Sequence, residues 1–248
     1  MARARAVVLL GFWSCAIAVL VPPLIVLAVA TKNENFLYKP VRFFVRIGMR
    51  LAGVRVKVSG IEHLDPKRTY VFTPNHQSII EVPLVVTYLP VNAAFLAKKE
   101  LFRFPIFGHG MRTIKVVPVD RRDRQAALKS TFQAVDNLRK GKSYIVYPEG
   151  TRSPDGRLLP FKKGAFLMAI EAGVPVVPIT VSGGAAVMPK GKAAIFPGTV
   201  HVAVHQPIDT HGYSKGQVQD LIEKTRTAIA SVLSEREQGA AESRSSGI

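Results

Sequence analysis

The sequence predicts an α/β domain with a largely parallel central sheet flanked by helices, preceded by an N-terminal membrane-embedded helical segment. From Val54 onward, short runs rich in β-branched residues alternate with stretches of helical length, which is typical of a parallel sheet with crossover helices. Before that point, residues 6–30 carry no charged side chain. The total of 248 residues suits one such domain plus the N-terminal segment.

The composition narrows the class of partner. The chain has 34 Lys and Arg against 17 Asp and Glu, a net charge of +17, yet 48% of its residues are hydrophobic and its mean hydropathy is +0.17. A nucleic-acid-binding protein would explain the charge but not the apolar content, whereas an anionic membrane surface explains both. The single cysteine, Cys15, excludes an intramolecular disulfide and a cysteine-rich zinc site. We therefore expect membrane lipids as partners, and no nucleic acid, metal or cofactor.

Residues 6–30 are predicted to anchor the chain in a membrane. As a helix, these 25 residues would reach roughly 37 Å, more than a bilayer core of about 30 Å. A cleaved signal peptide is the competing interpretation, weakened by the length of the apolar run and by the lack of a convincing cleavage site. Pro22 and Pro23 are expected to break the helix near its middle. Because basic residues flank both ends, a re-entrant hairpin and a simple span both remain open.

Residues 36–52 are predicted to form an amphipathic helix with a basic face. Apolar and cationic side chains each recur every three to four residues: Phe43, Phe44, Ile47 and Leu51 against Arg42, Arg46 and Arg50. Such a helix suits the lipid headgroup layer. The alternative is a helix of the domain, packed on the core with its arginines in solvent. The predicted division is an anchor over 1–52, the α/β domain over 53–237 and a disordered tail over 238–248.

Within the domain, strands and helices alternate along the chain. Strands are predicted at 54–59, 69–73, 93–97, 115–119, 143–147, 176–182 and 200–205. Helices are predicted at 79–88, 122–140, 164–172 and 215–236.

The first chemical constellation is NHQSIIE at residues 75–81, directly after an apolar strand. On one continuous helix His76 and Glu81 would lie about 140° apart, so they can meet only if His76 precedes the helix and Glu81 opens it. Pro74 favours this arrangement because it holds the residue before it extended. A carboxylate beside an imidazole fixes the ring tautomer and stabilises the cation formed when the other nitrogen takes a proton. Taken alone, the same spacing is common in ordinary polar turns.

The second constellation is YPEGTRS at residues 147–153, which also follows an apolar strand. Gly150 allows close backbone approach, Thr151 supplies a hydroxyl, and the planar guanidinium of Arg152 suits a phosphate. Arg121 follows a further strand, and loops at strand ends of α/β folds commonly carry binding groups. By composition, then, YPEGTRS is a moderately good anion site.

Four blocks occur in a fixed order along the chain: NHQSIIE, KKEL with VDRR, YPEGTRS and VPVVPI. Together they resemble the glycerolipid acyltransferase family, in particular its 1-acylglycerol-3-phosphate (lysophosphatidate) acyltransferases, over roughly residues 70–185. One position departs from the family pattern, whose acid in the first block is usually Asp where this chain has Glu81. The extra methylene moves the carboxylate by something over about 1 Å, so the helix start must sit differently to keep the histidine contact.

The resemblance implies an acyltransferase that moves a fatty acyl group from acyl-CoA or acyl carrier protein to the free hydroxyl of lysophosphatidate, giving phosphatidate. His76 would take the proton of that hydroxyl, and Glu81 would orient and stabilise the imidazolium. Two alternatives stay open. The acceptor could be another lyso-lipid, such as a lyso-ornithine lipid or lysocardiolipin, or the chain could be a catalytically inactive lipid-binding member of the fold.

The resemblance also implies a phosphate site and a location. Arg152, aided by Gly150 and Thr151, would bind the phosphate, with Arg121 and Lys99 as further contributors. Glu149 would either hold that arginine or contact the glycerol. Because the acceptor is a bilayer lipid and the chain is cationic, we expect it at a membrane, on the cytoplasmic face of the cell (inner) membrane.

Overall fold

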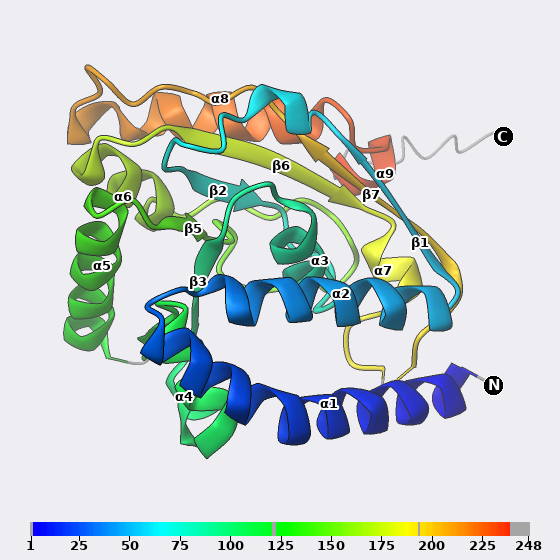
Figure 1. The fold of residues 1–248 in the computed structure, drawn as a ribbon. Coiled ribbons are helices and arrows are strands. Elements are labelled where there is room, and N and C mark those ends of the chain that lie inside the picture. Colours follow the sequence, from blue (N-terminus) through cyan, green and yellow to red (C-terminus); the bar gives the residue numbers. More distant parts are fainter. Residues whose placement is uncertain (1, 121–122, 193, 239–248) are drawn as a thin grey trace, which may run out of the picture.

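The computed structural model describes residues 2–120, 123–192 and 194–238, and within them the chain adopts an α/β fold (Figure 1). The strands are β1 (Val54–Ser59), β2 (Val71–Pro74), β3 (Ala93–Lys98), β4 (Val117–Val119), β5 (Ser143–Ile145), β6 (Val176–Ser182) and β7 (Gly198–Val204). The α-helices are α1 (Ala2–Ala30), α2 (Asn35–Leu51), α3 (Glu81–Tyr88), α4 (Pro105–Thr113), α5 (Arg124–Arg139), α6 (Gly164–Ala172), α7 (Gly184–Val187), α8 (Val218–Ala230) and α9 (Glu235–Gln238). Short 3₁₀ turns η1 (Ile61–His63), η2 (Lys99–Arg103) and η3 (Lys215–Gln217) complete the described elements.

The strands form one sheet in the order β1-β7-β6-β2-β5-β3-β4. All neighbouring pairs run parallel except β6 and β7, which are antiparallel. This confirms the predicted α/β class with a largely parallel sheet. It also means that β6, β2, β5, β3 and β4 point the same way, so that their carboxyl ends meet at one edge of the sheet.

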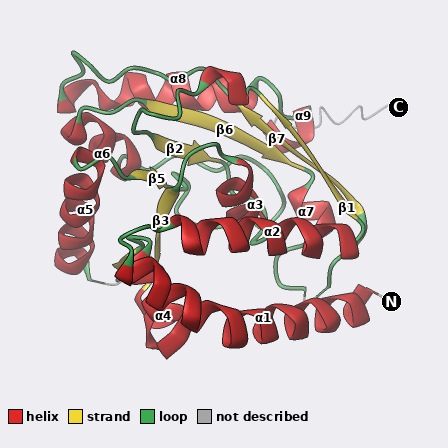
Figure 2. Ribbon diagram, in the orientation of Figure 1, coloured by secondary structure: helices red, strands yellow, loops and turns green. Residues whose placement is uncertain are grey.

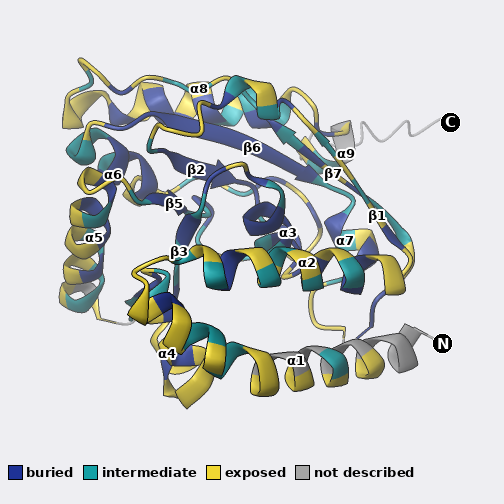
Figure 3. Ribbon diagram, viewed as in Figure 1, coloured by how far each residue is buried: buried dark blue, intermediate teal, exposed yellow. Residues whose placement is uncertain are grey.

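Helices cover both faces of the sheet, as the separate layers in Figure 2 show. Successive strand residues alternate between two cores: Phe72 and Ile145 pack with α2 and α3, whereas Val71 and Tyr144 pack with α5, α6 and α8. The strands between the helix layers are largely buried, while α1 and the outer sides of α5 and α8 are exposed (Figure 3). Burial on both faces explains the nearly continuous apolar runs from which the strands were predicted.

Most elements predicted within the domain are found, and apart from the last helix their bounds differ from the predicted ones by at most two residues. β1, β6 and α6 have the predicted bounds. The predicted helix over 215–236 is divided into η3, α8 and α9. Helix α4 was not predicted, because its two glycines obscure the helical pattern. Gly108 is needed there, since a Cβ would lie 2.5 Å from the Phe102 carbonyl oxygen.

The N-terminal helices differ from the expectation for residues 6–30. Helix α1 continues through Pro22 and Pro23, so the break predicted there is wrong. Its axis instead changes direction towards its C-terminal end (Figure 1), a common effect of helix proline. The chain reverses after Ala30, so that α1 and α2 form an antiparallel pair. The bilayer-crossing form of the anchor is not confirmed, because no helix in the described parts of the chain is both long and apolar enough for a span.

Helix α2 has one face on the domain. Tyr38, Val45 and Met49 are buried in the core that also contains α3. Arg42 donates to the Val91 carbonyl oxygen at 3.0 Å and to Asn92 Oδ1 at 3.1 Å. This part of α2 therefore matches the alternative of a helix packed on the domain, while the tail from residue 239 lies outside the described residues.

Candidate active site

The carboxyl-end edge of the parallel strands carries the residues predicted for catalysis and binding. His76 follows β2, YPEGTRS follows β5, Lys99 follows β3, and Asp120 follows β4. Neighbouring strands lie about 4.8 Å apart, so the loops after β2 and β5 are direct neighbours. The ends of β3 and β4 lie two and three strands away from β2.

The side chains of His76 and Glu81 meet. His76 lies in the turn before α3 and Glu81 is the first residue of that helix, as a contact at this spacing requires. Imidazole Nδ1 is 3.0 Å from Glu81 Oε2. Because Nδ1 faces the carboxylate, Nε2 on the far side of the ring points away from it.

The Glu81 carboxylate is fully buried and surrounded by N–H donors. Oε1 accepts from the backbone N–H groups of Gln77 at 3.1 Å and Ser78 at 2.9 Å, and Oε2 accepts from Gln77 N at 3.0 Å. Burial raises the pKa of Glu81 well above its ordinary value, opposed by these backbone bonds and by the charge of Arg152. Since donors surround both oxygens, the contacts suit the ionised form, and the ring proton of His76 then belongs on Nδ1.

Several backbone contacts fix the position of the histidine. Its N–H donates to Glu149 Oε1 at 2.6 Å, and its carbonyl oxygen accepts from Ser153 N at 2.7 Å. Its ring packs on that of Tyr147, with 4.0 Å between centroids. The preceding residue, Asn75, exchanges two hydrogen bonds with the backbone of Val181 on β6, at 2.9 and 2.7 Å. The turn is therefore tied to the loop after β5 and to β6.

The carboxylate of Glu149 binds backbone N–H groups. Besides His76 N, its carboxylate accepts from Leu159 N at 3.0 Å, and the side chain is only 3% exposed. Burial raises the pKa of Glu149 to about 7, while the hydrogen bonds from His76 and Leu159 and the charge of Arg226 lower it. These contacts favour a bracing role over a contact with Arg152 or with a glycerol.

The residues of YPEGTRS that were predicted to bind an anion occupy a turn beside His76 and Glu81. Gly150 has a φ of 71°, a conformation that favours glycine, and a Cβ there would lie 3.0 Å from Lys162 Nζ. Thr151 is exposed and Arg152 is half-buried. Among the described residues, the Arg152 guanidinium makes no hydrogen bond or ion pair, although its charge acts on Glu81. The guanidinium is thus available to an anionic ligand near the imidazole.

The basic candidates at the other end of the edge differ in setting. Lys99 forms an ion pair with Asp120, and its side chain is 50% exposed. The hydrogen bond with Asp120 raises the pKa of Lys99. Arg121, predicted as a second phosphate contact, lies outside the described residues. The ends of the neighbouring strands β3 and β4 thus bring Lys99 and Asp120 together. In the strand order, both ends lie on the side of β5 that faces away from β2.

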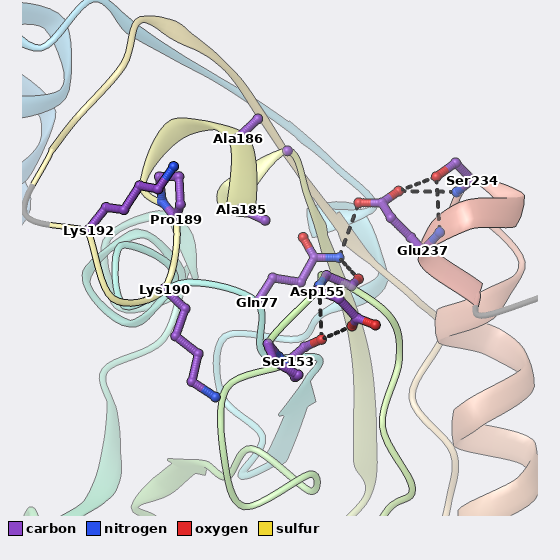
Figure 4. Close-up of a pocket in the computed structure, with 13 residues that line it drawn as sticks. Gln77, Ser153, Asp155, Ala185, Ala186, Pro189, Lys190, Lys192, Ser234 and Glu237 are labelled. Atoms are coloured by element: carbon purple, nitrogen blue, oxygen red, sulfur yellow. Dashed lines mark hydrogen bonds between the residues drawn. The ribbon is translucent and has the colours of Figure 1, made fainter.

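A pocket of about 560 Å³ adjoins the turn after β2, between residues 153–156, α7 and α9 (Figure 4). Gln77 forms part of its wall and donates to the Gly156 carbonyl oxygen at 2.9 Å and to Glu237 Oε1 at 3.1 Å. Lys190 and Lys192 also line it. Sequence reasoning missed these residues because they lie in variable positions of the blocks or outside them. No group of His, Cys, Asp and Glu able to hold a metal ion occurs within the described residues.

Comparison with known proteins agrees with the four blocks. The acyltransferase family matches residues 55–182, more than half of the chain. The chain is 39% identical over 178 residues to "1-acyl-sn-glycerol-3-phosphate acyltransferase LPAT1, chloroplastic" of Arabidopsis thaliana, covering 71% of this chain and 48% of that protein. It is 32% identical over 225 residues to "1-acyl-sn-glycerol-3-phosphate acyltransferase alpha" of Homo sapiens, covering 90% of this chain and 78% of that protein.

A solved structure is also similar. The crystal structure of the 1-acyl-sn-glycerophosphate (LPA) acyltransferase PlsC from Thermotoga maritima superposes with a TM-score of 0.78 at 28% identity, covering 92% of this chain and 95% of that one. The chain spans just under half the length of the chloroplast relatives from Brassica napus and Arabidopsis thaliana. Together with the four blocks, these matches confirm the predicted family. The chain belongs to the acyltransferase family.

Proposed function

We propose that the chain is a 1-acylglycerol-3-phosphate O-acyltransferase, which transfers a fatty acyl group from acyl-CoA or acyl carrier protein to lysophosphatidate and forms phosphatidate. The observation that carries this proposal is the 3.0 Å contact between His76 Nδ1 and Glu81 Oε2 beside Arg152. The names of the similar proteins support the same acceptor. A cofactor is not required, because the acceptor oxygen itself is the nucleophile.

The reaction follows from the geometry of the pair. Nε2 of His76 takes the proton of the acceptor hydroxyl while the oxygen attacks the thioester carbonyl carbon. Glu81 holds the Nδ1 proton and stabilises the imidazolium that forms. When the tetrahedral intermediate collapses, the C–S bond breaks and the leaving thiolate recovers the proton from Nε2. The products are phosphatidate and the free thiol of the donor.

Among the described cations proposed to bind the phosphate, Arg152 is the one nearest to His76 and Glu81. The free hydroxyl and the phosphate of lysophosphatidate belong to one glycerol unit, so the phosphate must bind close to the imidazole. Arg152 meets this condition because its loop follows β5, the strand next to β2, and because its charge acts on Glu81. Gly150 and Thr151 shape the same turn. Lys99, which follows β3 further along the edge, and Arg121 are proposed as secondary contacts.

The two alternatives, an inactive lipid-binding protein and an enzyme for another lyso-lipid, can each be compared with the site. An inactive lipid-binding member would be suggested by a Glu81 that missed the histidine, but the two side chains are in contact. A different lyso-lipid acceptor is also compatible with the pair: lysocardiolipin would offer Arg152 a phosphate, and a lyso-ornithine lipid only a carboxylate. The half-buried Arg152, whose charge acts on Glu81, therefore favours a phosphate-bearing acceptor, and the names of the similar proteins favour lysophosphatidate among these.

A mass-spectrometric assay of acyl transfer in detergent tests the function. Lysophosphatidate, lyso-ornithine lipid and lysocardiolipin are each offered with acyl-CoA and with acyl carrier protein. We expect phosphatidate as the main product with at least one donor. Transfer only to lyso-ornithine lipid or lysocardiolipin, or to none of the three, would contradict the proposal.

We also propose that residues 1–52 hold the domain over residues 53–237 at the cytoplasmic face of the cell membrane. Helices α1, α2 and α4 lie together on one side of the fold (Figure 1). Phe12 packs on Phe44, and Gly110 faces Val21. Many other apolar side chains of this layer are exposed, among them Val19, Val26, Phe43, Leu51, Phe104, Ile106 and Phe107. An exposed apolar surface on a chain of net charge +17 fits an anionic bilayer.

Vesicle flotation separates the two contributions to membrane binding. The full chain is expected to float with anionic vesicles even in high salt, because apolar contacts are not screened. A variant that lacks residues 1–30 is expected to bind anionic vesicles more weakly as salt rises, since it has lost the apolar side chains of α1 and depends more on charge. Salt-independent binding of the shortened variant would count against this division.

A further inference from the structure

The carboxylate of Glu81 fills space that a side chain on Gly184 would need. Gly184 is the first residue of α7, directly after the turn that follows β6. A Cβ built on it would lie 2.6 Å from Glu81 Oε1, 3.3 Å from Cγ and 3.4 Å from Cδ. The shortest of these distances is far below an ordinary van der Waals contact, so an alanine at position 184 and the present Glu81 conformation exclude each other.

Glu81 has little freedom to move aside. Its Oε1 accepts from the backbone N–H groups of Gln77 and Ser78, and its Oε2 contacts His76. The residue is fully buried. Any displacement of the carboxylate would therefore stretch hydrogen bonds in a buried site, where an unpaired polar group is costly.

Helix α7 is also held in place. Ser78 Oγ donates to the Met188 carbonyl oxygen at 2.7 Å, which ties the residue after α7 to the turn that carries His76. Phe196 N donates to the Val187 carbonyl oxygen at 2.9 Å. Relief of the contact by a shift of α7 would thus disturb the same turn.

The need for glycine at position 184 comes from Glu81 and not from the backbone. Gly184 does not have a positive φ, and the three atoms nearest its built Cβ all belong to Glu81. The preceding glycine is different: Gly183 has a φ of 82°, and its Cβ would meet the Thr199 carbonyl oxygen at 2.3 Å. Gly183 is therefore required by the fold, whereas Gly184 is required by one side chain.

We propose that Gly184 is a positioning residue that makes room for a glutamate, in place of the family's usual aspartate, so that the longer side chain can hold His76. The carboxylate of Glu81 projects one methylene further than that of an aspartate, and the missing Cβ of Gly184 leaves the space that this length needs. The inference rests on the proposed roles of His76 and Glu81. It makes the identities of residues 81 and 184 dependent on each other.

The test is a double-mutant cycle on the full chain in detergent, with phosphatidate formation and thermal unfolding as readouts. The variants are Gly184→Ala, Glu81→Asp and the two combined, and the matched control is Gly164→Ala, at a helix start where a Cβ meets no atom within 4 Å. We expect Gly184→Ala to lower kcat about 10²-fold with little change in the KM for lysophosphatidate. In the Glu81→Asp background the same substitution should lower kcat less than about threefold, because the shorter carboxylate leaves room for the methyl group.

The effect of Gly184→Ala on the unfolding midpoint should also depend on the residue at position 81. With glutamate at position 81, Gly184→Ala should lower the midpoint, whereas with aspartate there it should change the midpoint no more than Gly164→Ala does. Equal losses in both backgrounds, or no loss in either, would overturn the inference. The cycle in unfolding midpoint remains measurable if Glu81→Asp has little activity.

Wild type and His76→Ala, assayed in parallel, separate this inference from the proposed function. An inactive wild type or an active His76→Ala would contradict the proposed function, whatever the cycle shows. Normal behaviour of both, with a Gly184→Ala variant as active as Gly164→Ala, would contradict only the role of Gly184.

Discussion

The two halves of the strand-end edge are built differently. At the ends of β2 and β5, the His76 side chain is 14% exposed and Glu81 is fully buried. Backbone N–H groups donate to the carboxylates of Glu81 and Glu149. At the ends of β3 and β4, Lys99 is 50% exposed and pairs with a single carboxylate, Asp120. In the proposed mechanism, the first half fixes the proton positions that base catalysis needs, whereas the second offers a mobile charge that solvent screens.

The largest expected effect on activity is at the ends of β2 and β5, the half of the edge that carries His76 and Glu81 and is called the fixed half below. His76→Ala should lower kcat at least about 10³-fold, because it removes the proposed general base. Membrane binding should change little. Phosphatidate formation and vesicle flotation measure the two effects, with the exposed His211, in the turn after β7, as a matched control in His211→Ala. Residual activity within tenfold of wild type would show that the fixed half is not where the chemistry occurs.

Arg152 and Lys99 sharpen the comparison, because both are cations at strand ends. Arg152→Ala should raise the KM for lysophosphatidate about 10- to 100-fold with a smaller change in kcat, as expected for loss of a hydrogen bond to a charged group. Lys99→Ala should raise it less than about fivefold, because an exposed, paired lysine contributes less. Initial rates over a range of acceptor concentration give both values. A silent Arg152→Ala, or a larger effect at Lys99, would reverse the proposed assignment of the phosphate.

A third expected effect concerns how the stability of the fold depends on pH through Glu149. Its folded pKa of about 7 lies above its ordinary value of 4.5, so between these values the folded chain binds more protons than the unfolded chain. Stability should therefore fall as pH rises through this window, by up to about 3 kcal/mol from this group. Glu149→Gln should be less stable at low pH, because it loses an acceptor, but should show a flatter dependence. Unfolding midpoints between pH 4.5 and 7.5 measure this, and an unchanged slope would contradict the raised pKa of Glu149.

The motifs of the fixed half could be predicted from sequence because they are local. His76 and Glu81 are five residues apart, and their contact depends only on where α3 begins. The strands could be predicted because burial on both faces makes them apolar along their whole length. Their alternation with helices gave the parallel topology.

What could not be predicted depends on contacts between distant segments. Glu149 binds the backbone of His76 and Leu159, and no property of YPEGTRS indicates this. Gly184 meets Glu81 across more than one hundred residues of sequence. The course of α1 through its two prolines also depends on tertiary packing, since α2 and α4 lie against it.

The central claim, that Glu81 holds His76 with the proton on Nδ1 and the base on Nε2, can be tested directly by nitrogen NMR. Long-range ¹H–¹⁵N spectra of the full chain in detergent, labelled at the histidine rings and compared with His76→Ala, report which ring nitrogen carries the proton. The account predicts a protonated Nδ1 and an unprotonated Nε2 in the resting enzyme at neutral pH. A protonated Nε2 with a bare Nδ1 would contradict it.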